Sequence, residues 1–439
     1  MAPMQKGLLL FGLLFSLACE VCAQNIYHVR SGATGTNTGA DWRNAYPQLP
    51  AELKRGATYF IADGSYPAYD FNDVENGTDL ITIKKATATA AHGVDLFWDD
   101  TYGDGQASFN GSFSFSRDYY LIDGVTRNET NWFDSSSYGF HATGVYIQNQ
   151  NLPPGADNIT IKYCDLGAPY SQTFTSGQGE AVYLGGFASL IDDITVSHCF
   201  LHNWSFVQCA GVDGITVEYT AFAAGYAKEA FRGQATCKNG ILRHNLFYNS
   251  SQKDPDDPTS GTTAEIAIWD GGAGAFDNWE IYGNVIWNDK DIFHCCGTIV
   301  VGGDGISFVG APANNVKVYN NTIAGLRSSA VASIQVNGGT NNEVRNNIWY
   351  DCAGATNANP NTSNNGKIAN NPFVNYTGFN FRLSTELPGT PLSAPYNTDL
   401  DLVTRGADGI FDRGAFEFRG NPQVGQPNAP SSLRVVPLQ

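Results

Sequence analysis

A short phrase recurs along the middle of this chain and constrains its fold more than any other feature. Each copy has a polar turn, a strand of alternating apolar residues, and then a slot that holds Cys, Thr or Asn. The slot falls at positions 164, 199, 220, 245, 284, 321 and 347, so the intervals are 35, 21, 25, 39, 37 and 26 residues. A fixed minimum length with irregular additions is typical of a solenoid, in which loops project outward from each coil.

The slot itself has a structural explanation. A side-chain amide at a recurrent bend can bond to backbone groups of the neighbouring coils, and Asn tolerates the left-handed conformation that a sharp bend requires. We therefore predict a structural ladder along the Asn slots at 245, 284, 321 and 347. A second strand precedes each phrase, so each coil should carry two strands. Stacked coils of this kind give parallel sheets around a continuous interior.

Composition agrees with an all-β chain. Only 15% of residues are charged, 48 residues are Gly, and 13% are aromatic, which favours turns and stacked strands over helices. No stretch shows a convincing amphipathic helical pattern beyond about three turns.

We predict one all-β solenoid over residues 24–418 with an N-terminal cap. Residues 419–439, which contain four Pro, should form a linker or tail, or the start of a further β-module.

The first 23 residues have the features of a signal peptide. Lys6 supplies the positive end, Leu8 to Ala18 is an apolar run too short to span a membrane, and Val21-Cys-Ala23 is a small-residue cleavage site. A short membrane anchor and a lipoprotein cut before Cys19 fit these residues less well. We expect a secreted protein, extracellular or periplasmic, that is not inserted in a membrane and is a monomer.

Charge and cysteine content narrow the partners and the chemistry. A net charge of −17 repels nucleic acid and anionic membranes, and argues mildly against a strongly polyanionic substrate unless basic clusters or cations intervene. Removing Cys19 and Cys22 with the leader leaves seven Cys, an odd number with no zinc spacing. We interpret most of them as buried thiols, although Cys164 and Cys199 share a slot and could stack or form a bridge between coils.

Three motifs outside the repeats resemble a known superfamily. They are the opening Tyr27-His-Val-Arg-Ser-Gly32 with Asp41-Trp42, then Tyr59-Phe-Ile-Ala-Asp-Gly64, and the closing Arg413-Gly-Ala-Phe-Glu-Phe418. With the repeats, they make the chain similar to secreted, right-handed parallel β-helix proteins of the pectate-lyase-like superfamily. The resemblance implies a single-stranded right-handed parallel β-helix. It also implies a lyase, hydrolase or epimerase acting on polysaccharide, or an adhesin. The paired-Asp pattern of polygalacturonases and the Asp-Pro-His-Glu string of alginate epimerases are absent. The lysine-plus-arginine arrangement of chondroitinase- and alginate-lyase-like families is matched only loosely, so no catalytic residue is transferred.

One strand carries unusual charge for its repeat. The segment Lys228-Glu-Ala-Phe-Arg232 has two basic residues and one acidic residue where other coils have Ala, Val, Ile and Phe. A lyase that cleaves a uronate needs a base for the C5 proton and a cation to stabilise the charge that develops. Lys228 or His244 is a candidate base, Arg232 a candidate for neutralising the carboxylate, and Glu229 a further catalytic candidate. The alternative is a solvated Lys/Arg pair on an outward face.

Acidic residues begin several equivalent strands. Glu180, Glu229 and Glu265 occupy this position, with Asp304 close to it. Equivalent positions in a parallel stack lie about 4.8 Å apart, and stacked like charges are costly unless a cation lies among them. The three glutamates are therefore candidate Ca²⁺ ligands. Alternatively, two of them form the carboxylate pair of a glycoside hydrolase, or the acids accept bonds from loop amides.

Aromatic side chains supply candidate sugar contacts. Tyr183, Trp204, Trp269 and Trp287 could stack on a sugar ring, with Asp270 as a polar neighbour, although a place in the core is the commoner outcome for each aromatic. The long insertions at 167–179, 250–263 and 287–304 should wall a groove beside the strands that begin at 180, 205, 229 and 265.

The sequence supports three functional hypotheses for this surface. The first is a lyase that cleaves an acidic polysaccharide by β-elimination. The second is a glycoside hydrolase that uses paired carboxylates on the same class of polymer. The third is a non-catalytic, glycan-binding or adhesive β-helix, which is favoured if the Lys228/Arg232 strand faces a closed loop.

Overall fold

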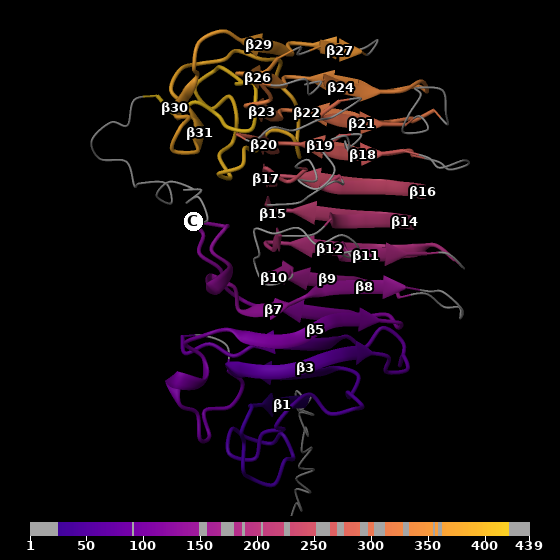
Figure 1. The fold of residues 1–439 in the computed structure, drawn as a ribbon, viewed down its shortest axis with the longest axis vertical. Helices are drawn as coiled ribbons and strands as arrows, with labels where there is room; N and C mark the ends of the chain where they lie inside the picture. Colours follow the sequence, from indigo (N-terminus) through magenta and orange to yellow (C-terminus); the bar gives the residue numbers. More distant parts are fainter. Residues whose placement is uncertain are drawn as a thin grey trace, which may run out of the picture.

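The computed structural model shows coils stacked along one long axis (Figure 1). It describes residues 25–89, 92–148, 156–167, 180–186, 189–202, 205–223, 229–251, 264–269, 276–289, 297–302, 312–327, 333–353, 356–358 and 362–420. Within these residues, 29 strands join in one sheet whose pairings are all parallel. The expected leader lies outside the described residues, and so does the expected tail beyond residue 420. No helix within the described residues is long and apolar enough to cross a membrane.

The strands form three parallel faces, which we call sheets A, B and C in the order in which a coil of the central repeat visits them. Sheet A contains β3 (Gly64–Phe71), β5 (Ala107–Phe115), β8 (Gly144–Gln148), β11 (Glu180–Gly185), β14 (Ser205–Glu218), β16 (Phe231–Arg243), β18 (Ile266–Ile268), β21 (Ile299–Val301), β24 (Ser333–Val336) and β27 (Thr356–Ala358). Sheet B contains β1 (Asn25–Val29), β2 (Ala57–Ile61), β4 (Ile81–Lys85), β6 (Tyr120–Asp123), β9 (Ile159–Lys162), β12 (Ile191–Ser197), the second parts of β14 and β16, β19 (Glu280–Tyr282), β22 (Lys317–Tyr319), β25 (Glu343–Arg345) and β28 (Thr362–Ser363). Sheet C contains the first parts of β3 and β5, β7 (Phe140–Ala142), β10 (Cys164–Gly167), β13 (Phe200–His202), β15 (Ala221–Ala223), β17 (Leu246–Tyr248), β20 (Val285–Trp287), β23 (Thr322–Ala324), β26 (Ile348–Tyr350) and β29 (Gly366–Ile368).

Each repeat contains three strands, so the prediction of two strands per coil is wrong. The third strand follows the slot and is often only three residues long, as in β17 and β20. A run this short shows too little alternation to be recognised in a sequence. The segment 287–304, expected to be one insertion, likewise contains β21, a strand of sheet A that pairs with β18.

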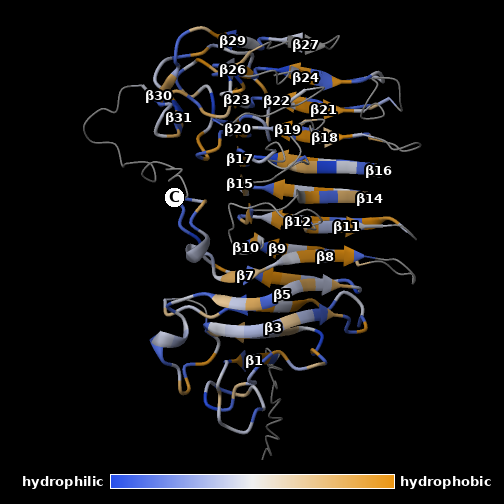
Figure 2. Cartoon of the chain, in the orientation of Figure 1, coloured by the Kyte–Doolittle hydropathy of each residue, from blue (hydrophilic) through white to orange (hydrophobic). Residues whose placement is uncertain are grey.

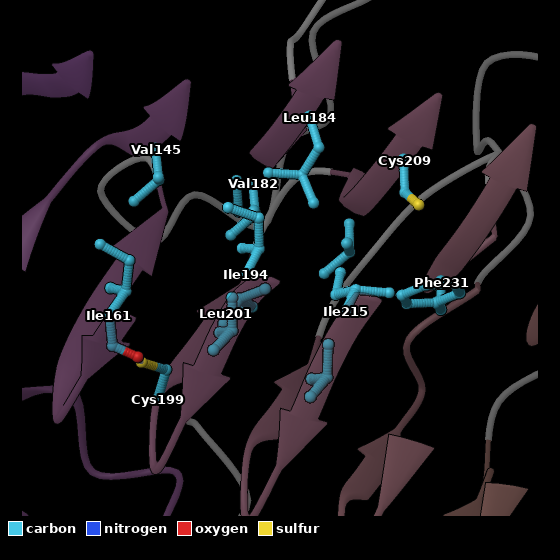
Figure 3. Close-up of a cluster of buried hydrophobic side chains, with 14 of the residues drawn as sticks. Val145, Ile161, Val182, Leu184, Ile194, Cys199, Leu201, Cys209, Ile215 and Phe231 are labelled. Carbon is cyan, nitrogen blue, oxygen red and sulfur yellow. The ribbon is translucent and has the colours of Figure 1, made fainter. Parts of the chain in front are cut away.

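The core is the space that the three sheets enclose. Alternate strand residues point into it, and Figure 3 shows Val182 and Leu184 of β11 meeting Ile194 of β12 and Leu201 of β13. These four side chains are almost completely buried. Figure 2 shows the apolar bands that this alternation leaves along successive strands. Because each coil adds its own layer of apolar side chains, the core grows in length and keeps a constant thickness.

The predicted Asn ladder is confirmed at the bend between sheets B and C. Asn245, Asn284 and Asn321 each donate from the backbone N–H to the Oδ1 of the next Asn, at 3.0, 3.0 and 2.9 Å. Each Nδ2 also donates to a carbonyl of the preceding coil at 2.9 Å. The left-handed backbone belongs to the residue before the slot, such as His244 at φ 56°, rather than to the slot residue as expected.

The described cysteines are mostly buried thiols. Cys164, Cys199 and Cys352 are free and buried, and the first two donate to backbone carbonyls of their own coils at 3.3 Å. The suggested bridge between Cys164 and Cys199 is therefore absent. A disulfide joins Cys209 to Cys237.

Two segments outside the coils cover the outer face of sheet C. Residues 125–139 contribute Trp132 and Phe133, and residues 373–418 contribute several aromatic and aliphatic side chains to one apolar cluster with Leu246 and Trp287 of sheet C. The second segment includes the antiparallel pair β30 (Phe373–Asn375) and β31 (Asn380–Leu383), and it lies beside the later coils in Figure 1. Sheet C is thus closed to solvent over much of its length.

The first coil is covered in a different way. His28 of β1 donates its backbone N–H to the Gly39 carbonyl and accepts from Tyr46, at 2.9 Å each. Trp42 is fully buried nearby against the edge of the Trp98 ring. Residues 38–46 thereby occupy the edge of β1 that a preceding coil would otherwise pair with.

Candidate functional site

The outer face of sheet A carries a line of polar and aromatic side chains. In β16, Phe231 points into the core, so its neighbour Arg232 points outward. The strand register aligns Arg232 with outward residues of the other coils, and this outward line consists of Tyr146, Tyr183, Gln208, Arg232, Ala267, Val300 and Gln335.

Arg232 lies at the centre of a small cluster. Its Nε is 3.7 Å from Oε2 of Glu229, and its Cζ lies 5.3 Å from the centre of the Trp269 ring. With the Gln234 amide oriented to place its oxygen toward the guanidinium, Arg232 donates to it from Nη2 at 2.9 Å and from Nε at 3.1 Å. The Arg232 side chain is 24% exposed. Three neighbours therefore fix a guanidinium that still reaches solvent, a suitable arrangement for binding a carboxylate.

Trp269 bounds this line on one side. It packs on Ala267 and Val300, which are buried, so exposure along the line stops after Arg232 and resumes only at Gln335. The indole N–H is buried and has no hydrogen-bond partner within the described residues.

Tyr183 lies two coils from Arg232 on the same line, a separation of about 10 Å. Its ring centre is 6.3 Å from that of Tyr146 in the preceding coil, and both rings are half-buried. Burial raises the pKa of Tyr183, and the nearby Glu180 carboxylate adds to the effect. The line thus offers two adjacent phenol rings and, further along, a cation.

The three glutamates do not form one cluster. Glu180 pairs in register with Ser205, whereas Phe231 pairs with Ile266, which aligns Glu265 with Ala230 rather than with Glu229. Glu265 is fully buried and accepts a hydrogen bond from the Ser250 hydroxyl. No group of three His, Cys, Asp or Glu side chains within the described residues is placed to hold a metal ion. The three glutamates therefore do not stack on successive coils as the sequence suggested.

His244 is not a plausible base. It follows β16 at the bend between sheets B and C, far along the strand from Arg232, and only 3% of it is exposed. Its ring stacks on Tyr219 at 5.2 Å and meets Tyr282 edge-on at 5.4 Å. Burial lowers the pKa of His244 to about 3, helped by the positive charges of Arg405 and Arg243.

Trp287 is also a structural residue. It is 5% exposed and lies on sheet C, where its ring stacks on Tyr248 at 4.5 Å and contacts Phe379 at 4.2 Å. The segment 373–418 covers it, so it cannot stack on a sugar as predicted.

Several predicted residues lie outside the described part of the chain. They are Lys228, Trp204, Asp270 and Asp304. Three residues of the site, Tyr146, Gln208 and Gln234, were missed by sequence reasoning. Alignment of the coils would have found Tyr146 and Gln208, which are in register with Tyr183 and Arg232. Alternation within β16 would have found Gln234, which lies two residues after Arg232 on the same face.

Solved structures, but no sequence matches, show which known proteins have this architecture. No family model and no curated protein matches the sequence. Among solved structures, pectate lyase Pel9A superposes with a TM-score of 0.52 at 14% identity, over 90% of this chain and 97% of that one.

The fold is a right-handed parallel β-helix. A PL6 family polysaccharide lyase from Pseudopedobacter saltans is matched more loosely, with a TM-score of 0.32 at 14% identity over 78% of this chain and 94% of that one. The A-module of the Azotobacter vinelandii mannuronan C-5 epimerase AlgE6 has a TM-score of 0.25 at 12% identity, over 70% of this chain and 91% of that one. At these identities the β-helix likeness concerns the fold alone.

Proposed function

We propose that this β-helix is an exported polysaccharide lyase that cleaves an acidic, uronate-containing polysaccharide by β-elimination on the outer face of sheet A. The observation that carries the proposal is the guanidinium of Arg232, held by Glu229 and Gln234 on an otherwise uncharged line of outward residues. The fold shared with a pectate lyase adds support.

The reaction assigns a specific task to each group. A base removes the proton from C5 of the uronate, the electron pair forms the C4=C5 double bond, and the C4–O bond breaks as the leaving oxygen takes up a proton. Negative charge develops on the carboxylate as the C5 proton departs, and a guanidinium beside it lowers the barrier. Arg232 takes this role, and Glu229 positions it.

Lys228 is the candidate base that remains. It immediately precedes Glu229 in the sequence, whereas His244 lies at another corner of the coil and stays neutral. Tyr183 and Tyr146 supply ring surface for the sugars on one side of Arg232, and Trp269 does so on the other.

The test measures the ultraviolet absorbance of the unsaturated product while the protein acts on polygalacturonate, alginate and glucuronate polymers, with and without Ca²⁺. The Arg232→Ala variant should lose about 10²–10³-fold in rate and keep its melting temperature. Arg345→Ala is the matched control, because Arg345 pairs with Glu343 at 2.8 Å on sheet B with 34% of its side chain exposed. New reducing ends without this absorbance would replace the lyase with a hydrolase. Binding without cleavage would leave a glycan-binding protein.

A further inference from the structure

A hollow of about 390 Å³ opens at the far end of the β-helix, away from the Arg232 cluster. It lies where the last coils leave sheet C: Arg327 follows β23, Asp351 follows β26, and Lys367 is in β29. The volume falls within the range of about 300–1,000 Å³ that is usual for small-ligand sites. We call this hollow the Arg327 pocket.

One wall of the pocket is a held guanidinium. Nε of Arg327 donates to Oδ2 of Asp351 at 2.6 Å, a terminal nitrogen of Arg327 pairs with the same oxygen, and the Tyr376 hydroxyl donates to it at 3.2 Å. Asp351 has a left-handed backbone, with φ 54°. The Arg327 side chain is nevertheless 60% exposed. A guanidinium has five N–H groups in a fixed fork, so the donors that Asp351 does not use remain available.

The other wall carries an uncompensated positive charge. Nζ of Lys367 donates to the Cys352 carbonyl at 2.6 Å, which uses one of its three donors. Within the described residues Lys367 has no carboxylate partner. Asp351 balances Arg327, so Lys367 gives the pocket a net positive charge in a chain whose net charge is −17. Such a spot attracts an anion.

The remaining surface of the pocket is apolar. Besides the three charged residues, the lining consists of Tyr350, Cys352, Ala353, Ile368 and Ala369. Apolar surface beside two cations suits a ring that has C–H groups on its faces and a carboxylate at its edge, which describes a uronate residue better than an inorganic anion.

The pocket is separate from the outer face of sheet A. The coil that contains Arg327 lies two coils beyond that of Arg232, and the coils of Asp351 and Lys367 lie three and four coils beyond it. These separations correspond to distances of about 10–19 Å along the axis. Arg327 and Asp351 also lie at the corner after sheet C, and Lys367 lies in the last strand of sheet C, whereas Arg232 points outward from sheet A. A polymer that occupies both places must therefore span several sugar residues.

We propose that the Arg327 pocket is a second, non-catalytic binding site for a uronate residue of the same acidic polysaccharide. The substrate class rests on the proposed function. Lys367 and Arg327 bind the sugar carboxylate, Asp351 positions Arg327, and Tyr350 and Ile368 contact the ring. The site holds a long polymer while another stretch of it occupies sheet A.

Calorimetric titration with uronate trisaccharides tests the proposal in the Arg232→Ala protein, in which the sheet A site is weakened and the probe is not consumed. Trimers of galacturonate, glucuronate and mannuronate are the probes, and neutral galactose and glucose trimers are the controls. Lys367→Gln removes the charge but can still donate to the Cys352 carbonyl. It should weaken binding about tenfold, as expected for a lost charge-assisted bond. Lys317→Ala, a sheet B lysine paired with Glu280 at 3.5 Å, should bind as its parent does.

Three results would overturn the proposal. The first is equal affinity of the protein for charged and neutral trimers. The second is equal affinity of the Lys367→Gln and Lys317→Ala proteins for a uronate trimer, and the third is no binding of any uronate trimer. In the otherwise unchanged protein, Lys367→Gln should raise the KM for polymer about threefold or more and leave the rate on trisaccharide unchanged. The binding titration needs no cleavage, so it still decides the matter if the lyase assay gives no product.

Discussion

The outer faces of sheets A and C have the same strand geometry and opposite surroundings. On sheet C, outward residues such as Leu246, Val285 and Trp287 are apolar and lie beneath the segments 125–139 and 373–418. On sheet A, the outward line includes Tyr183, Gln208 and Arg232, all partly exposed. Alternation alone makes both sets point away from the core. The difference shows that a residue's outward position in a β-helix says little about its role until the segment that covers it is known.

Removing one tryptophan from sheet C should have the largest effect on folding. Trp287→Ala deletes a ring that stacks on Tyr248 and contacts Phe379, so the free energy of unfolding should fall by about 3–5 kcal/mol. Chemical denaturation measures this change. A loss below about 1 kcal/mol would mean that the segment 373–418 packs only loosely on sheet C.

The Asn ladder provides a second contrast, between a buried and an exposed row. Asn284 is fully buried and forms hydrogen bonds with Asn245, Asn321 and the Leu242 carbonyl. Asn284→Ala should therefore lower the free energy of unfolding by about 3 kcal/mol. Asn278 belongs to an exposed row at the bend between sheets A and B. Asn278→Ala should therefore lower the free energy of unfolding by only about 1 kcal/mol. Equal losses in the two denaturation curves would show that burial of the ladder is not what makes it stabilising.

Acidification should weaken the covered side of the molecule through His244. Its pKa is lowered to about 3 in the folded protein, against about 6.5 in the unfolded chain. The unfolded chain therefore takes up the proton first, and stability that is complete above pH 6.5 declines as the pH falls. The loss from His244 should be about 2 kcal/mol at pH 5.

His198 adds to this decline in the same direction, because burial lowers its pKa to about 4. The stability measured by denaturation should fall less between pH 7 and pH 5 for His244→Gln than for the unchanged protein. A slope unchanged by His244→Gln would contradict the buried, neutral imidazole.

The smallest effect on stability is expected at the tryptophan of sheet A. Trp269→Ala leaves the core intact and should lower the free energy of unfolding by about 1 kcal/mol, because Trp269 packs on the small outer cluster of Ala264, Ala267 and Val300. Loss of its ring beside Arg232 should raise the Kd for a uronate oligomer about tenfold. Compared with Trp287→Ala, this variant should show the reverse pattern, with binding affected more than folding. A larger loss of stability than of affinity would assign Trp269 to the core.

Much of the fold could be predicted from the repeat. The Asn slots at 245, 284 and 321 identified a bend, and the strands before them identified sheet B correctly. The third strand was missed because three residues such as Leu246 to Tyr248 carry too little periodicity. In the site, Arg232 was recognised by its unusual charge, whereas Gln208 and Tyr146 were not, since only the pairing of coils aligns them with it.

The sequence by itself determined that this chain winds into stacked coils, because a spaced repeat of apolar strands can bury its side chains only against its own copies. Only the tertiary structure decided which side of the coil is open. His244 and Trp287 have sequence neighbourhoods like those of exposed residues, yet a bend and a distant segment enclose them. Contacts of residues 373–418 with strands more than a hundred positions earlier, such as that of Phe379 with Tyr248, leave no local pattern, so neither the closed face nor the open one can be read along the chain.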